Sequence, residues 1–187
     1  MYDIIGLRNW LVGRLYQYLT MPVVPNDDSP RPAKPFLAYT ITSPYIPQAA
    51  PPVIEYSDVV KVPPTEEGEE PGAPENWSRK QRTEYPTIVW SITAVADTQQ
   101  GCYEAVLQAR RWFALDGRDG LKARGIVVAR LEPVQDRSLI LDETQAEYRA
   151  GFDVALRVCS QISIDIEQIE AVRVNETEYP TEMKEIL

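Results

Sequence analysis

The alternation of apolar and polar positions predicts a helix at the start of the chain. Over residues 3–19, apolar side chains recur at spacings of three and four, the period of an amphipathic α-helix. Asp3 can cap this helix, and Pro22 and Pro25 follow its end. Because the apolar stripe is broad, we expect it to pack on a sheet rather than on a membrane surface. The stripe consists of Ile4, Leu7, Leu11, Leu15 and Tyr18, with Trp10 and Leu19 beside it.

A period of two residues predicts strands in five later segments, at 36–42, 87–97, 126–134, 147–160 and from 161 onward. In 126–134, Val127, Ala129 and Leu131 share one parity. After Ile162, Ile164 and Ile166 the last segment shifts phase to Ile169, Val172 and Val174, so a bulge, a bend or a change to helix is possible there, and we favour a strand. The most regular segment, 147–160, has one apolar parity: Tyr148, Ala150, Phe152, Val154, Leu156 and Val158.

A second helix is predicted between the strands at 87–97 and 126–134. Asp97 with Gln100 resembles a capping box, and Gly117 is suited to end the helix. A short helical turn follows at 119–125. We therefore predict an α+β fold: a mainly antiparallel sheet, mixed where the second helix crosses over, with two helices covering one face. The buried stripe of this helix consists of Cys102, Ala105, Val106, Ala109 and Phe113.

Residues 44–82 are rich in proline and acidic side chains, and a loop of that length is unusual inside a compact domain. We interpret this segment as an arm. It is either a solvated linker or an extension that orders against a neighbouring subunit, and the strand-like island at 53–62 is more than a linker needs. The whole chain, 1–187, is expected to be one domain with this arm and an acidic tail at 175–187.

The net charge of −9 argues against a nucleic-acid-binding protein, because binding to phosphates needs Lys and Arg. Weak repulsion would still suit a conduit through which DNA slides. The two cysteines, Cys102 and Cys159, lie on apolar stripes, so we expect buried free thiols and a reducing compartment. No segment is predicted to span a membrane, and the first residues do not resemble a signal peptide, so we expect a cytosolic protein.

The chain contains no histidine, the side chain most used for acid–base catalysis near neutral pH. It also lacks nucleophile-elbow, phosphate-loop and dinucleotide-binding motifs, and its carboxylates form no paired motif. We predict no catalytic, cofactor-binding or metal-binding residue, and no enzymatic activity. A hydrolase with paired carboxylates is the enzymatic alternative.

Charged side chains occupy the polar parity of the longest strand. Arg149, Asp153 and Arg157 recur at spacings of four, and Arg130 and Arg137 lie on the neighbouring segment. A solvated sheet surface would explain these charges. A surface that docks on a second copy of the chain would also carry them, because charges determine register and reject wrong partners. We predict these five residues as candidates for a subunit interface.

The order of these segments resembles the neck or tail terminator proteins of long-tailed bacteriophages. The resemblance covers roughly residues 1–175. It is carried by "YTITSPY" after an N-terminal helix, the proline-rich arm, "EYPTIVWSITAVAD" before "YEAVLQARRWF", "GIVVARLEPVQDRS" and above all "EYRAGFDVALRV".

This resemblance implies a virion structural protein. The expected assembly is a hexameric ring that caps the tail tube, ends its polymerisation and joins the tail to the head. The implied partners are the tail tube protein, the tail sheath and a head-completion or connector protein; genomic DNA passes through the lumen without specific binding. Assembly would occur in the host cytoplasm, without a membrane. The alternative from another class is a non-enzymatic adaptor or assembly chaperone.

Overall fold

The computed structural model describes residues 3–27, 30–61, 75–140 and 146–167. The chain divides into two compact units, one from Met1–Ile54 and Gln81–Ile162, the other from Glu55–Lys80 and Ser163–Leu187. The acidic tail at 175–187 lies outside the described residues. The predicted single domain stays a prediction.

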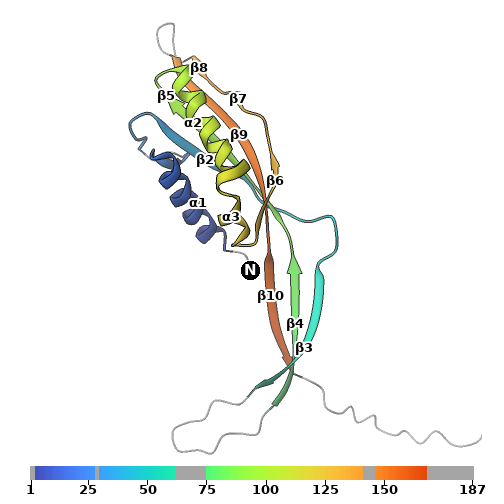
Figure 1. Cartoon of the computed structure of the whole chain (residues 1–187). Helices are drawn as coiled ribbons and strands as arrows, with labels where there is room; N and C mark the ends of the chain where they lie inside the picture. Colours follow the sequence, from blue (N-terminus) through green and yellow to red (C-terminus); the bar gives the residue numbers. More distant parts are fainter. Residues whose placement is uncertain (1–2, 28–29, 62–74, 141–145, 168–187) are drawn as a thin grey trace, which may run out of the picture. The chain divides into compact units, whose positions relative to one another are not determined.

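A seven-stranded sheet forms the centre of the first unit (Figure 1), with the order β1-β2-β5-β9-β6 and with β7 and β8 also paired to β9. The β1–β2 pair is parallel and the others are antiparallel. The α+β prediction is confirmed. The place predicted for parallel pairing was wrong, because β9 lies between β5 and β6 and is antiparallel to both. The strands are β1 (Val23–Pro25), β2 (Phe36–Ile46), β5 (Thr87–Ala96), β6 (Ile126–Leu131), β7 (Gln135–Asp136), β8 (Leu139–Ile140) and β9 (Ala146–Val158).

Two longer helices, α1 (Ile4–Leu19) and α2 (Gln99–Arg111), cover one face of this sheet (Figure 1). Asp3 caps α1 as predicted, its Oδ1 accepting from the Gly6 N–H at 2.8 Å. Tyr18 was wrongly included in the buried stripe: it is exposed, and its hydroxyl donates to Asp116 at 2.6 Å. The reason is that leucines at a spacing of four already fill the face toward the sheet, Leu7, Leu11, Leu15 and Leu19.

The cap of α2 also differs from the prediction. Thr98, one residue after the predicted Asp97, is the N-cap, and its Oγ1 accepts from Gly101 N–H at 3.1 Å. The Gln100 side chain donates to Glu104 instead of closing a capping box. A π-helical turn, η1 (Trp112–Asp116), and the short α3 (Arg118–Lys122) continue from α2.

The main core lies between the helices and the inward parity of β2, β5 and β9. Phe152, Val154 and Leu156 are fully buried there, as their parity predicted. The parity of β6 was misjudged: Ile126 is buried and Val127 is exposed. A register shift between Val128 and Arg130 changes the alternation, so that Leu131 still packs on the core.

The opposite face of the sheet carries a smaller apolar cluster of Phe36, Ala38 and Val95, with Val24 packed against it. Of the two cysteines, Cys102 is buried as predicted, whereas Cys159, between β9 and β10, is only half-buried. Both thiols are free.

A three-stranded sheet has the order β10-β4-β3, with β3 (Val53–Lys61), β4 (Glu75–Glu84) and β10 (Ser160–Glu167). The island predicted at 53–62 is β3. The rest of the expected arm is less irregular than predicted, because β2 extends to Ile46 and β4 occupies its end. The first half of the last predicted strand is β10; the phase shift at 169–174 lies outside the described residues.

Among the described residues, no helix is long and apolar enough to cross a membrane.

Candidate functional site

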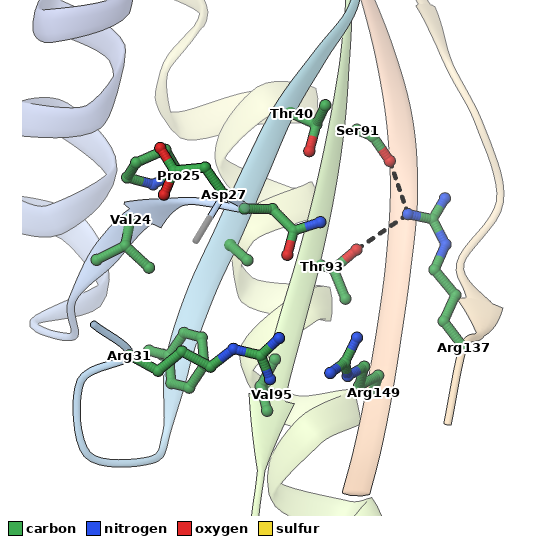
Figure 2. Close-up of a pocket in the computed structure, with 13 residues that line it drawn as sticks. Val24, Pro25, Asp27, Arg31, Thr40, Ser91, Thr93, Val95, Arg137 and Arg149 are labelled. Carbon is green, nitrogen blue, oxygen red and sulfur yellow. Dashed lines mark hydrogen bonds between the residues drawn. The ribbon is translucent and has the colours of Figure 1, made fainter. Parts of the chain in front are cut away.

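A recess of about 230 Å³ lies on the sheet face opposite α1 and α2 (Figure 2). Its walls come from the outward parity of β2, β5 and β9 and from the segment that follows β1. Three arginines line it, Arg31, Arg137 and Arg149, so we call it the arginine recess. Asp27 is the acidic residue in its lining.

Arg137 is held across the strands rather than extended into solvent. Its backbone N–H donates to the Arg149 carbonyl at 2.8 Å, which anchors the segment between β7 and β8 against β9. Its Nη1 donates to Ser91 Oγ at 2.7 Å and Thr93 Oγ1 at 3.0 Å (Figure 2). Its Nη2 donates to Asp153 at 2.9 Å. Charge-assisted bonds to three groups, on Ser91, Thr93 and Asp153, fix the orientation of this guanidinium.

Gly151 makes this position possible. A Cβ on Gly151 would lie 2.7 Å from Arg137 Nη1, 2.7 Å from the Ile92 carbonyl oxygen and 2.8 Å from Thr93 Oγ1. The missing side chain therefore leaves the space that the Arg137 guanidinium occupies over β9. In the strand register, Thr93 lies opposite Gly151 and Ser91 lies opposite Asp153.

Arg149 is paired with a buried carboxylate. Its Nε donates to Glu147 Oε2 at 2.8 Å, and its Nη2 also contacts this oxygen. Glu147 is only 7% exposed. Its Oε1 lies 3.3 Å from Arg31 Nη1 and 3.9 Å from Lys34 Nζ. Three cations thus surround one carboxylate, which offsets the cost of burying its charge.

Asp153 is the second acidic anchor of the site. Burial raises the pKa of its carboxyl, but hydrogen bonds from Arg137 and Ser91 outweigh burial and hold the pKa below its ordinary value. Asp153 is therefore ionised at neutral pH and holds Arg137 over the sheet.

The three arginines of the recess are matched by three acids, Asp27, Glu147 and Asp153, so the site is a network of paired charges on the sheet face. Guanidinium groups bind carboxylates through several directed hydrogen bonds, and Arg31 is the most exposed of the three arginines. The arginine recess includes no histidine, since the chain has none. Within the described ranges, no group of three or more His, Cys, Asp or Glu side chains is placed to hold a metal ion.

The five predicted interface residues separate into two groups. Arg137, Arg149 and Asp153 come together at the arginine recess. Arg157 is exposed further along β9, opposite Thr87 and Val127. Arg130 belongs to the edge strand β6, where its Nε pairs with Glu132 at 2.6 Å. The role of these five residues in a subunit interface stays a prediction.

Two members of the site were not found from the sequence, Arg31 and Glu147. Arg31 lies in a proline-rich connection without periodicity, so no pattern placed it near the sheet. Glu147 could have been found, because it shares the polar parity of Arg149 two residues later.

A second surface lies on the three-stranded sheet. On one face, Asp165 accepts from Arg79 at 2.7 Å and lies 3.0 Å from Lys61 Nζ; Lys61 also lies 3.9 Å from the centre of the Trp77 ring. The other parity carries exposed apolar side chains, with Lys80 near the Tyr56 ring. We call these the apolar stripe: Tyr56 (64% exposed), Val60 (63%), Ile164 (60%) and Ile166 (45%).

Together, these features are typical of a structural protein that works through its surfaces: an α+β core, a sheet face with oriented charges, and an apolar stripe on a second sheet. A comparison with known protein families identifies the family. Residues 4–181 match the family model for phage neck terminator protein, and the chain belongs to that family. A search of curated proteins found no match.

Family membership confirms the predicted resemblance and identifies a structural protein of the phage neck. Its location is therefore the neck of the virion. This class of protein agrees with the predicted lack of enzymatic activity, which stays a prediction for this chain.

Proposed function

We propose that the protein assembles into a hexameric ring that caps the tail tube and joins the tail to the head. The observation that carries the proposal is the apolar stripe. Its side chains are exposed on one face of the outer strands β3 and β10, on either side of β4, and exposed apolar surface of this kind marks protein interfaces. A ring of identical subunits would cover the stripe with protein on every copy.

The ring would leave a lumen through which genomic DNA passes. The net charge of −9 supports transit without adhesion, because an acidic wall repels phosphates. The tail tube protein, the tail sheath and a head-completion or connector protein are the partners we expect at the two rims. Ring assembly would take place in the host cytoplasm, before the head and tail join.

The stripe can be tested by placing charge on it. Val60→Glu with Ile164→Glu should leave the melting temperature nearly unchanged, because both side chains are exposed, and should prevent ring formation. Light scattering and negative-stain images, with and without tail tube protein, would measure assembly. Leu107→Glu, an exposed apolar position on α2, is the matched control and should still form rings.

Two results would contradict the proposal. Wild-type protein that stays monomeric at every concentration, even with the tail tube protein, would favour an adaptor or assembly chaperone. Rings that form equally well from the double variant would show that the stripe is not the interface.

A further inference from the structure

A groove of about 470 Å³ lies between α3 and β6, at one edge of the seven-stranded sheet (Figure 1). Leu121 and Ile126 line it and are buried, so its base is apolar. Two cations, Arg118 and Lys122, line it from α3, together with one acid, Asp119. Both cations are exposed, and within the described residues neither makes an ion pair. The groove therefore combines an apolar base with an excess of positive charge.

The strand beside this groove, β6, has a free edge. It pairs with β9 on one side, and among the described strands none pairs with its other side. The N–H and C=O groups along such an edge can bond to a further strand. Leu121 belongs to the main core, so α3 and its two cations lie on the helical face. Arg157, opposite Val127 in the register, is exposed on the other face, so cations lie on both faces near the edge.

The free edge is short. A register shift between Val128 and Arg130 interrupts β6. Bulges of this kind bend a strand and limit pairing at an edge. Regular pairing is therefore confined to residues 126–128, beside the groove, which favours one specific partner strand over open-ended stacking.

A second free edge belongs to β3, in the three-stranded sheet. β3 pairs with β4, and no described strand pairs with its other side. Nearly all of its residues are exposed. Glu55 of β3 is exposed and makes no ion pair to any residue that the structure describes. This edge therefore offers a negative charge and apolar side chains, which complement the groove beside β6.

The other strand edges are less suited to the groove. In β10, Asp165 already accepts from Arg79 and lies 3.0 Å from Lys61, so its charge is neutralised within its own sheet. β1 has only three residues and ends in Pro25, which cannot donate a backbone hydrogen bond. Charge and length therefore favour β3 as the partner strand.

The alternation of side chains in β3 also agrees with the two faces of β6. Glu55 lies on one parity, whereas Asp58 and the two β3 residues of the apolar stripe lie on the other. A strand added to β6 with Glu55 in the groove would place its charge beside the two α3 cations. The opposite parity would then lie on the outward sheet face, where Val127 is 59% exposed and Arg157 could meet Asp58.

We infer that β3 of one subunit adds to the free edge of β6 in the neighbouring subunit, with Glu55 against Arg118 and Lys122. The inference rests on the proposed ring, because the subunits of a ring meet through two different surfaces. It assigns those surfaces: the edge of β3 with part of the apolar stripe, and the edge of β6 with its groove. Backbone hydrogen bonds would supply affinity, and the charges would determine register.

Exchange of the charges provides the test. Glu55→Lys should prevent ring formation, and so should the double variant Arg118→Glu with Lys122→Glu, because each brings like charges together. The exposed positions should leave both melting temperatures nearly unchanged. An equimolar mixture of the two proteins should form rings again, because every contact in an alternating ring then joins opposite charges. Light scattering and negative-stain images would measure assembly.

The control for the charge change is Glu104→Lys. Glu104 is an exposed acid on α2, bonded to Gln100, and this variant should form rings like the wild type. If Glu55→Lys and the double variant also form rings like the wild type, the inference is wrong and the proposed ring stands. If each is impaired and their mixture does not recover, the two sets of charges do not meet and the inference is wrong as well.

A labelled peptide of residues 53–61, "VIEYSDVVK", separates this contact from the ring. Fluorescence anisotropy with full-length protein should show binding that weakens about tenfold when the peptide carries Glu55→Lys. Protein with Arg118→Glu and Lys122→Glu should reverse that preference. If the wild type forms no rings but the peptides follow this exchange, the ring fails and the contact stands. Peptides that bind equally to both proteins would overturn the contact.

A nucleic acid is the other occupant that the cations of the groove could bind. A DNA duplex should bind the wild type no more tightly than it binds the double variant. Binding of the duplex that Arg118→Glu with Lys122→Glu abolishes, while rings still form, would assign the groove to DNA and overturn the inference.

Discussion

At the residue scale, Phe152 shows what strand parity decides. Its side chain is fully buried, and its ring lies 6.1 Å from that of Phe113 in an edge-on geometry. Phe152→Ala should lower the free energy of unfolding by roughly 3–5 kcal/mol, because it leaves a cavity in a packed core. Chemical denaturation would measure the change. A loss below about 1 kcal/mol would mean that this parity of β9 is not the core side.

Gly151 tests the construction of the arginine recess. Gly151→Ala should destabilise the fold by about 1–3 kcal/mol, because the new Cβ displaces the Arg137 guanidinium from Ser91, Thr93 and Asp153. Unfolding by denaturant would measure the loss. Gly13→Ala is the control, since no atom lies within 4 Å of its Cβ position in α1. It should stabilise by about 0.5–1 kcal/mol through helix propensity. Equal effects at both sites would argue against a packed Arg137.

At the scale of elements, two neighbouring residues, Asp97 and Thr98, can be compared as the N-cap of α2. Thr98→Ala should cost about 1 kcal/mol of stability, because the Gly101 N–H loses its acceptor. Asp97→Ala should cost less, since Asp97 is exposed and its ion pair with Lys34, at 3.7 Å, is a surface pair. Thermal unfolding of the two variants would compare them, and the reverse order would restore Asp97 as the cap.

The three-stranded sheet predicts a pH dependence through Asp165. Hydrogen bonds from Arg79 and then Lys61 lower the pKa of its carboxyl to about 2. Because the folded pKa lies below the ordinary value of about 3.9, this group stabilises the fold above that value and loses its contribution as pH falls toward 2. Carboxyl NMR titration would measure the pKa. Arg79→Gln should raise it, whereas Arg82→Gln, on the same strand and paired with Glu84, should leave it unchanged.

At the scale of the whole molecule, Arg157 on the outward face of β9 should matter for assembly and not for folding. Arg157 is exposed there. Arg157→Glu should keep the wild-type melting temperature and impair formation of the proposed ring, because it reverses a charge on the sheet surface. Light scattering would compare assembly. A fall in melting temperature as large as that of Phe152→Ala would show that Arg157 faces the core.

The pattern of apolar and polar positions was sufficient to predict most of the helices and strands. Periods of 3.6 and 2 residues depend only on which side of an element is buried, so α1, α2, β5 and β9 were predicted together with their inward parity. The resemblance to the family rested on the order of those elements, and the family model confirmed it. The errors, at Tyr18, Thr98 and Val127, occur at a flank, a helix end and a bulge. At such places one neighbouring contact outweighs the periodic pattern.

The sequence did not show which set of charged side chains forms the arginine recess. Arg31, Arg137 and Glu147 come from three segments that no local period relates, and they meet because β9 pairs with β5 on one side and with β7 on the other. These strands are far apart in the sequence, and only the folded sheet shows which of them pair. Linear order therefore defined the core, the class of fold and the family, whereas strand pairing across the sheet assembled the arginine recess.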